Sequence, residues 1–267
     1  MKVQVLQFYV TPANTKKNEQ KITELFAQTI HDDTDIVVLP EMWNNGYALT
    51  VLQEKSDHSL SQAYPFIRQL AQQYNVDIIA GSVSNHQDGS LYNTAFNVLH
   101  DGTLNDYYHK IHLVPMLDEP QFLDAGDQVP DTFTLSNGTL ASQIICYDLR
   151  FPEISRYPAA KGAEILFYVA QWPDTRQAHW RKLLQARAIE NNAYIVAANG
   201  CGFDGQTTYA GHSMIINPNG DIIAEAQEDE ATLTAVLDMH MVTEQRKAIP
   251  VFDNMRPEVY RYHFNKK

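Results

Sequence analysis

The sequence predicts an α/β fold, because short apolar segments rich in β-branched residues alternate with longer segments of helical periodicity. The chain has 267 residues, of which 44% are hydrophobic and 19% charged, a composition typical of a globular protein with a sizeable core. Neither a low-complexity tract nor a linker interrupts the alternation. We therefore expect one domain over residues 1–267, with its core in about 1–240 and a C-terminal tail over 241–267.

The N-terminal part of the chain repeats a strand and helix pattern. Its first helix carries Ile22, Phe26 and Ile30 at helical spacing, and Asn14 or Thr15 is placed to cap it. In chain order, the strand, helix, strand, helix and strand are predicted at residues 3–8, 18–31, 36–39, 59–74 and 76–81.

The remainder of the chain contains two hairpins and a further alternation of strands and helices. Asp101-Gly102 and Asn219-Gly220 predict the tight turns of the hairpins. Strands are predicted at residues 92–99, 104–108, 139–145, 164–169, 194–198 and 231–237, and helices from Pro152 onward and over 176–192. The second of these helices is expected to turn its larger apolar residues inward, namely Trp180, Leu183, Leu184 and Ile189.

The segment over 249–267 is rich in proline, aromatic and basic residues and fits no periodic element. Five ring side chains in a free tail, four of Phe or Tyr and one of His, would form an exposed apolar surface. We therefore expect this tail to pack, with a partner subunit as the candidate surface.

Charge and hydropathy exclude several classes of function. The net charge is −12, with 20 basic against 32 acidic residues, which argues against binding of nucleic acid or an anionic membrane. No apolar run has the length of a membrane span, and the first residues lack the pattern of a signal peptide. Because the two cysteines show no framework spacing, we expect free thiols and a cytoplasmic location.

One of the two cysteines, Cys146, stands where a predicted strand meets a predicted helix. Backbone N–H groups and the positive end of the helix dipole at such a turn would favour the thiolate, so we expect a lowered pKa. A lone cysteine is more often a small buried hydrophobic residue. The ionisable Asp148 and Arg150 close by favour a reactive site instead.

Three ionisable residues follow predicted strands: Glu41, Lys110 and Cys146. A carboxylate can accept the thiol proton, the thiolate can attack a carbonyl or nitrile carbon, and an ammonium can stabilise the oxyanion that forms. Taken singly, Glu41 and Lys110 would be ordinary surface residues. As a set at strand ends they predict nucleophilic catalysis.

Three segments, in this order, resemble the three motifs of the nitrilase, or carbon–nitrogen hydrolase, superfamily. They are Leu39-Pro40-Glu41, His109-Lys110-Ile111-His112-Leu113 and Cys146-Tyr147-Asp148-Leu149-Arg150-Phe151-Pro152-Glu153. Residues 169–173, 184–191 and 209–213 are most similar to omega-amidases, which hydrolyse the side-chain amide of 2-oxo acids such as 2-oxoglutaramate and 2-oxosuccinamate. The resemblance implies a four-layer αββα sandwich, a homodimer, and a thioester mechanism that releases ammonia.

The resemblance also assigns roles to single residues. It implies Glu41 as general base, Lys110 as oxyanion stabiliser and Cys146 as nucleophile. Glu119 matches a second glutamate of the family, although Pro120 departs from the pattern and the neighbouring Asp118 is an alternative.

Four further residues are candidates for the substrate pocket: Tyr47, Tyr147, Arg150 and Trp172. The backbone N–H of Tyr147 is a second candidate donor to the oxyanion. Arg150 could bind a substrate carboxylate, or could instead form a structural ion pair with Glu153 or Asp148. Gln171 stands where asparagine is commoner in the superfamily, which leaves the choice of substrate open.

No cofactor or metal is expected. Four histidines can be considered as metal ligands: His109, His112, His179 and His212. They lack the spacing of a ligand cluster, and two of the four lie in apolar, strand-like surroundings. Within the superfamily, an N-carbamoyl-amide hydrolase or a nitrilase is the alternative. Outside it, the alternatives are a thiol peptidase or thioesterase that pairs Cys146 with His109 or His112, and a binding protein without turnover.

Overall fold

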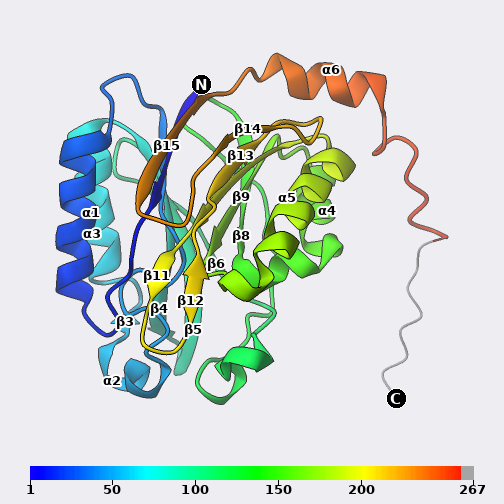
Figure 1. Ribbon diagram of the computed structural model, residues 1–267. Helices are drawn as coiled ribbons and strands as arrows, with labels where there is room; N and C mark the ends of the chain where they lie inside the picture. Colours follow the sequence, from blue (N-terminus) through cyan, green and yellow to red (C-terminus); the bar gives the residue numbers. More distant parts are fainter. Residues whose placement is uncertain (260–267) are drawn as a thin grey trace.

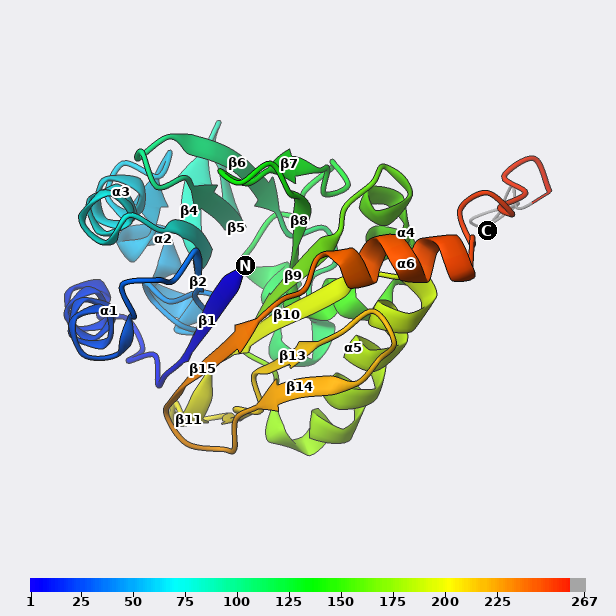
Figure 2. The same cartoon turned by 90° about the horizontal axis from the view of Figure 1, so that it is seen from above.

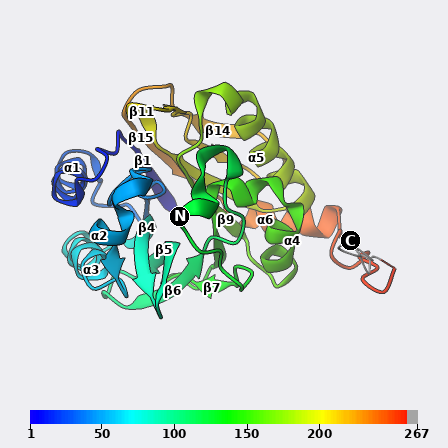
Figure 3. The same cartoon turned by 90° about the horizontal axis from the view of Figure 1, so that it is seen from below.

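Two β-sheets stack face to face with helices on both outer sides in the computed structural model, which describes residues 1–259 (Figure 1). Helices α1 (Thr15–Thr29) and α3 (Ala63–Tyr74) cover the outer face of the first sheet. On the opposite side, α4 (Pro152–Ala160) and α5 (Gln177–Asn191) cover the second sheet, as Figure 3 shows from below. The predicted αββα sandwich is therefore confirmed.

The first sheet has seven strands and pairs β1, from the start of the chain, with β15, from residues 231–236. Its order is β15-β1-β2-β4-β5-β6, with the short β3 beside β4. The strands β1, β2 and β4 run parallel, whereas β15 and the hairpin β4-β5-β6 add antiparallel neighbours. Their bounds are β1 Lys2–Gln7, β2 Ile36–Val38, β3 Asp57–His58, β4 Asp77–Gln87, β5 Ser90–Val98, β6 Leu104–His109 and β15 Ala231–Val236.

The second sheet has six strands in the order β14-β13-β10-β9-β8-β7, and its centre, β8-β9-β10, is parallel. A separate two-stranded sheet joins β11 to β12. The bounds are β7 Phe133–Thr134, β8 Leu140–Ile145, β9 Ile165–Ala170, β10 Tyr194–Asn199, β11 Cys201–Phe203, β12 Thr208–Ala210, β13 Met214–Ile216 and β14 Ile222–Glu225. Both predicted hairpins are present, as β5-β6 and β13-β14.

The layers follow from the alternation of side chains along the strands. In β2, Ile36 and Val38 belong to the core between the two sheets, whereas Val37 belongs to the core under α1 and α3. All three are buried, so this strand reads as a continuous apolar run rather than an alternating one. The cap of α1 is Asn14 rather than Thr15, because the Asn14 side chain accepts a hydrogen bond from the Lys17 amide.

One predicted inward residue of α5 is wrong. Trp180 and Leu184 are fully buried, but Ile189 is 53% exposed. The buried row continues instead through Ala188, four positions after Leu184, and Ile189 lies about 100° further around the helix.

Helix α6 (His240–Ala248) was not predicted, because only one of its residues, Val242, is buried. Its anchor is polar: the guanidinium of Arg246 donates to the backbone carbonyls of Gly162, Ala163 and Asn192, which follow α4 and α5. Figure 2 shows α6 running from β15 across the layer that contains α4.

The tail beyond α6 is described only to residue 259, so the last eight residues of the predicted 241–267 segment lie outside the described residues. Residues 250–259 form turns, in agreement with the lack of periodicity in their sequence. None of the helices formed by residues 1–259 is long and apolar enough to cross a membrane.

Short helical turns connect the longer elements, and some of them carry polar side chains of the site, such as Glu119 and Cys146. The α-helical turn α2 covers Leu52–Lys55. The 3-10 turns are η1 Leu49–Val51, η2 Pro115–Leu117, η3 Glu119–Gln121, η4 Cys146–Arg150 and η5 Asp174–Arg176.

Candidate active site

Glu41 is delivered by β2 and is fully buried between the two sheets. The strand ends at Val38, and the following turn passes close to β4, where Gly81 has φ +62. A Cβ at Gly81 would lie 1.9 Å from the Pro40 carbonyl oxygen, so only glycine allows this approach. The register of β4 against β5 also shifts at this point, between Ile79 and Ser82. Beyond the shift, β4 continues to Gln87 and is longer than the predicted 76–81 strand.

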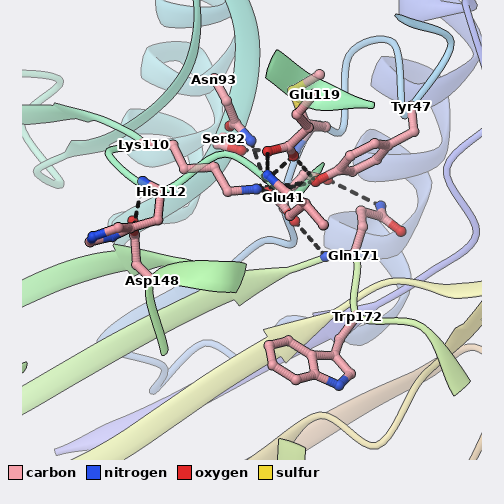
Figure 4. A network of polar contacts seen from close by, with 12 residues as sticks. Glu41, Tyr47, Ser82, Asn93, Lys110, His112, Glu119, Asp148, Gln171 and Trp172 are labelled. Carbon is pink, nitrogen blue, oxygen red and sulfur yellow. Dashed lines mark hydrogen bonds and ion pairs between the residues drawn. The ribbon is translucent and has the colours of Figure 1, made fainter. Parts of the chain in front are cut away.

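Lys110 follows β6 and is also buried, at 1% exposure. Its Nζ donates to Glu41 Oε1 at 2.9 Å, to Glu119 Oε1 at 2.7 Å and to the Tyr47 hydroxyl at 3.3 Å (Figure 4). Burial alone would lower the pKa of Lys110, but the carboxylates of Glu119 and Glu41 outweigh it and raise this pKa above its usual value. Lys110 is therefore an ammonium held between two carboxylates.

Of the two candidates for the second carboxylate, Glu119 contacts Lys110 and Asp118 does not. Glu119 is fully buried, and its Oε2 accepts the Val114 amide at 2.7 Å. Asp118 is exposed and accepts a hydrogen bond from the Gln121 side chain. Pro120 fits because it occupies the start of η3, where a missing N–H costs no helical hydrogen bond. Burial raises the pKa of Glu119, although Lys110 opposes this shift.

Tyr47, a predicted substrate-pocket residue, places its hydroxyl between the carboxylates of Glu41 and Glu119. Its hydroxyl is 2.9 Å from Glu41 Oε1 and 2.6 Å from Glu119 Oε1. Burial, followed by the two carboxylates, raises its pKa well above the usual value. The neutral hydroxyl therefore bridges the carboxylates and fixes their separation.

The two oxygens of Glu41 have different surroundings. Oε1 accepts two N–H groups, from Asn93 Nδ2 at 2.8 Å and Lys110 Nζ at 2.9 Å, and lies 2.9 Å from the Tyr47 hydroxyl, whose single proton it shares with Glu119 Oε1. Oε2 accepts one N–H, from the Gln171 backbone at 2.7 Å. Oε1 is therefore surrounded by donors, and Oε2 is the oxygen with room to accept a further one.

Cys146 follows β8 at the start of η4, with φ +43 and 3% exposure. A left-handed φ at a non-glycine residue stores strain and turns the side chain out of the strand direction. Burial raises the pKa of Cys146 well above its usual value, and the charge of Glu41 adds to this, while Lys110 opposes it. The thiol therefore lies within the electrostatic reach of Glu41 and Lys110.

The expected lowering of the Cys146 pKa is wrong in direction. Helix α4 begins only at Pro152, and η4 stands between it and the thiol. The helix dipole acts over one turn, so it does not reach Cys146. The raised pKa favours the neutral thiol at rest.

Asp148 ties the Cys146 turn to the segment that carries Lys110. It is fully buried, and it accepts the Tyr108 hydroxyl at 2.7 Å, the His112 amide at 3.0 Å and His112 Nδ1 at 2.7 Å. His112 also stacks on Phe151, with ring centroids 3.5 Å apart. Sequence analysis missed this network. Its only signal in the sequence was an aspartate two residues after the cysteine.

Neither histidine that could have paired with Cys146 does so. His109 contacts Thr94 Oγ1 at 2.9 Å and stacks on Tyr92, and His112 is engaged by Asp148. Over residues 1–259, no group of three or more His, Cys, Asp or Glu side chains is arranged to hold a metal ion.

A small pocket opens onto Cys146 and is lined on one side by aromatic and cationic groups. The Arg150 guanidinium lies over the Trp172 ring, 4.8 Å from its centroid, and 5.7 Å from the Tyr147 ring centroid. Arg176, which sequence analysis did not single out, lines the same pocket and accepts the Trp172 indole N–H through its carbonyl. The opposite wall is apolar and consists of Val114, Met116 and Leu117.

Arg150 therefore faces the pocket, and the structural ion pair considered for it is not formed. Asp148 has its hydrogen-bond donors in Tyr108 and His112, and no ion pair between described residues joins Arg150 to Asp148 or Glu153. Trp172 is 2% exposed and belongs to both the core and the pocket wall.

Comparison with known proteins agrees with this arrangement. Residues 2–247 match the family model of carbon-nitrogen hydrolases, so the chain belongs to the carbon–nitrogen hydrolase family. A solved protein of the same superfamily from Xanthomonas campestris superposes with a TM-score of 0.88 at 27% identity, covering 96% of this chain and 97% of that one.

Two curated relatives span nearly the whole chain. A protein of Staphylococcus aureus named hydrolase in agr operon is 52% identical, covering 98% of this chain and 100% of the relative. A 2-oxoglutaramate amidase of Bacillus subtilis is 37% identical, covering 97% of this chain and 98% of the relative. The chain is a carbon–nitrogen hydrolase, which excludes the non-catalytic binding protein considered above.

Proposed function

We propose that this hydrolase is an omega-amidase, which cleaves the terminal amide of a small 2-oxo acid such as 2-oxoglutaramate or 2-oxosuccinamate. The observation that carries the proposal is the position of Cys146 between the Glu41–Lys110 pair and a pocket that contains Arg150 and Arg176. Two guanidinium groups suit a substrate that carries a carboxylate at the end opposite its amide. The similarity to the Bacillus subtilis 2-oxoglutaramate amidase supports the same substrate class.

In the proposed reaction, Glu41 Oε2 accepts the proton of the Cys146 thiol while sulfur attacks the amide carbon. Glu41 then donates this proton to the departing nitrogen, and ammonia leaves a thioester on Cys146. Water next loses a proton to Glu41 and attacks the thioester, which releases the acid and restores the thiol. In each half of the reaction, the same oxygen of Glu41 thus first accepts a proton and then donates it, to the departing nitrogen in the first half and to the Cys146 sulfur in the second.

Lys110 stabilises the oxyanion formed in both steps. Its three N–H donors are directed to Glu41, Glu119 and Tyr47, and the contact with Tyr47 is the longest at 3.3 Å. This weakest hydrogen bond is the one that the oxyanion replaces, with the Tyr147 backbone N–H as the second donor. Glu119 keeps the ammonium in place during the exchange.

We also propose that the chain works as one hydrolase domain and as a homodimer. Tyr157 on α4 and Ile189 on α5 are 41% and 53% exposed, and both lie on the outer helices of the second sheet. Covering these apolar side chains with a second copy would remove them from water. Light scattering of the purified protein should give twice the chain mass. A cytoplasmic location stays a prediction from the sequence.

Ammonia release from a substrate panel tests the proposed activity. The panel contains 2-oxoglutaramate, 2-oxosuccinamate, glutamine, a carbamoyl amine and a nitrile, with Cys146→Ala as the inactive control. We expect the 2-oxo acid amides to give the highest kcat/KM. A higher value for the carbamoyl amine or the nitrile would contradict the substrate assignment and favour the corresponding alternative.

Arg150→Gln sharpens the test, because it keeps a polar side chain but removes the charge that faces the pocket. We expect KM for the 2-oxo acid amides to rise by about tenfold or more, the cost of one lost charged hydrogen bond, with a smaller effect for an uncharged amide such as acetamide. Equal effects on both kinds of amide would show that Arg150 does not recognise the carboxylate.

A further inference from the structure

We propose that Gln171 and Gly200 form a positioning unit that aims Oε2 of Glu41 at the Cys146 thiol. The proposal rests on the function proposed above, in which Oε2 exchanges the proton. It adds a role for two residues that touch neither the thiol nor the pocket.

Gln171 connects the two sheets at the point where the base meets the nucleophile. Glu41 follows β2 in the first sheet, and Gln171 follows β9 in the second. The Gln171 backbone N–H donates to Glu41 Oε2 at 2.7 Å, and its side-chain Nε2 donates to the Glu41 carbonyl oxygen at 3.1 Å (Figure 4). One residue therefore fixes both the main chain and the reactive oxygen of Glu41.

These two hydrogen bonds have a particular weight because of the asymmetry of the carboxylate. Oε1 has N–H donors of its own in Asn93 and Lys110 and would stay in place without Gln171. Oε2 depends on the Gln171 backbone N–H alone among the hydrogen bonds of the described residues. Losing the Gln171 side-chain hydrogen bond to the Glu41 carbonyl should let the Glu41 main chain shift relative to this N–H, which turns Oε2 while leaving the ion pair with Lys110 intact.

Gly200 provides the space that the Gln171 side chain occupies. It follows β10, and its N–H donates to the Ala170 carbonyl at 2.9 Å, so it lies directly beside Gln171. A Cβ at position 200 would lie 2.1 Å from Gln171 Oε1 and 2.6 Å from Nε2. The backbone of Gly200 is not in the left-handed region, so a side chain is excluded there by the Gln171 amide and not by conformation.

Hydrogen bonds of a neighbouring residue keep the two backbone segments at this contact from moving apart. Asn199 Oδ1 accepts the Trp172 amide at 2.7 Å, and Asn199 Nδ2 donates to the Gly211 carbonyl at 2.7 Å. The segments on both sides of the Gln171–Gly200 contact are thus held by buried hydrogen bonds. A methyl group at position 200 must therefore displace the Gln171 side chain from the Glu41 carbonyl.

The test is a double-mutant cycle of Gly200→Ala and Gln171→Ala in the full-length enzyme, measured with the panel substrate that wild type turns over fastest. Each single variant should lower kcat by about tenfold, since one orienting hydrogen bond is lost, and leave KM within about twofold. If Gly200 serves only to seat Gln171, the double variant should be no slower than Gln171→Ala alone. Additive losses in the double variant, or a wild-type kcat in Gly200→Ala, would overturn the proposal.

A second measurement does not depend on the substrate. The ionisable groups that act on Cys146 are Glu41, Lys110 and Glu119. Because the Glu41 charge raises the pKa of the thiol, turning Oε2 away should move the pH midpoint of Cys146 alkylation to lower pH in both single variants. An unchanged midpoint would contradict the positioning role.

The two outcomes can be separated. A wild-type protein that releases no ammonia from the panel would contradict the proposed function, and the alkylation midpoint would then decide the positioning role by itself. If Gly200→Ala does not fold, Gln171→Ala provides both readouts, because it introduces no clash.

Discussion

The two sheets contribute to the active site in different ways. The first sheet supplies charges that are already paired: Glu41 and Lys110 are buried, form an ion pair and are both contacted by the Tyr47 hydroxyl. The second sheet supplies Cys146, a neutral thiol with a strained backbone, and the pocket wall around Arg150. The difference indicates that the charged residues of the first sheet are held in place before substrate binds, whereas the Cys146 thiol of the second sheet has no such pairing.

This division also explains why burial alone does not mark the nucleophile. Cys146 and Cys201 are each 3% exposed, and burial raises the pKa of both, that of Cys201 to about 12. Only Cys146 lies beside the carboxylate and ammonium of the first sheet. The charged groups across the sandwich, rather than burial, therefore distinguish the two thiols.

Removing the nucleophile should have the largest effect. Cys146→Ala should lower kcat by about 10⁴-fold or more, because no thioester can form. The matched control, Cys201→Ala, removes the other buried thiol and should keep nearly the wild-type rate. Ammonia release by the two variants, with circular dichroism to confirm folding, compares the two cysteines directly, and equal losses would refute the assignment.

Glu41→Gln should rank second, because it preserves shape but leaves no base in contact with the thiol. General acid–base catalysis contributes about 10²- to 10⁴-fold, so we expect a loss of about 10³-fold in kcat with little change in KM.

The same variant should move thiol ionisation in the opposite sense to activity. Removing the Glu41 charge takes away a cause that raises the Cys146 pKa, so alkylation should begin at lower pH while turnover falls. A variant in which KM rises and kcat is unchanged would show that Glu41 binds substrate instead.

Lys110→Met keeps the side-chain stem and removes the ammonium. Loss of one oxyanion donor should lower kcat by about 10²- to 10³-fold. Glu41 and Glu119 would also be left as two unpaired buried carboxylates, so the free energy of unfolding should fall by about 3 kcal/mol or more. Urea denaturation measures the second effect, and unchanged stability would mean that the first sheet is less tightly balanced than its contacts indicate.

Asp148→Asn should have the smallest effect, because it weakens the connection between the sheets without touching the reacting atoms. The hydrogen bonds of Tyr108 and His112 to a charged acceptor contribute about 1.5–3 kcal/mol each, and an amide would retain part of this. We expect a lower melting temperature and a loss in kcat of about tenfold or less. A loss as large as that of Glu41→Gln would place Asp148 in the chemistry itself.

Much of the fold could be predicted from the sequence. The strands around the core, both hairpins and the four covering helices were predicted from local signals such as β-branched runs, helical spacing and turn pairs. The exceptions depend on contacts that local sequence signals do not show. Helix α6 is anchored by Arg246 to backbone carbonyls, and Ile189 falls one position outside the buried row of α5.

The site was predictable as a set of residue types and not as a geometry. Strand ends and motif resemblance identified Glu41, Lys110 and Cys146, because chemistry requires those groups and strands deliver them. Three features of the site depend instead on tertiary contacts. They are the oxygen of Glu41 that has fewer donors, the position of the Tyr47 hydroxyl between the carboxylates, and the close contact of Gln171 with Gly200.

The Cys146 pKa shows the physical reason most clearly. Sequence placed the thiol at a strand end and ahead of a helix, and from that alone a lowered pKa followed. Burial and the charge of Glu41, a residue 105 positions earlier in the chain, raise it instead. Local sequence determines backbone conformation, but electrostatics acts through space, so only the tertiary structure decides the state of the nucleophile.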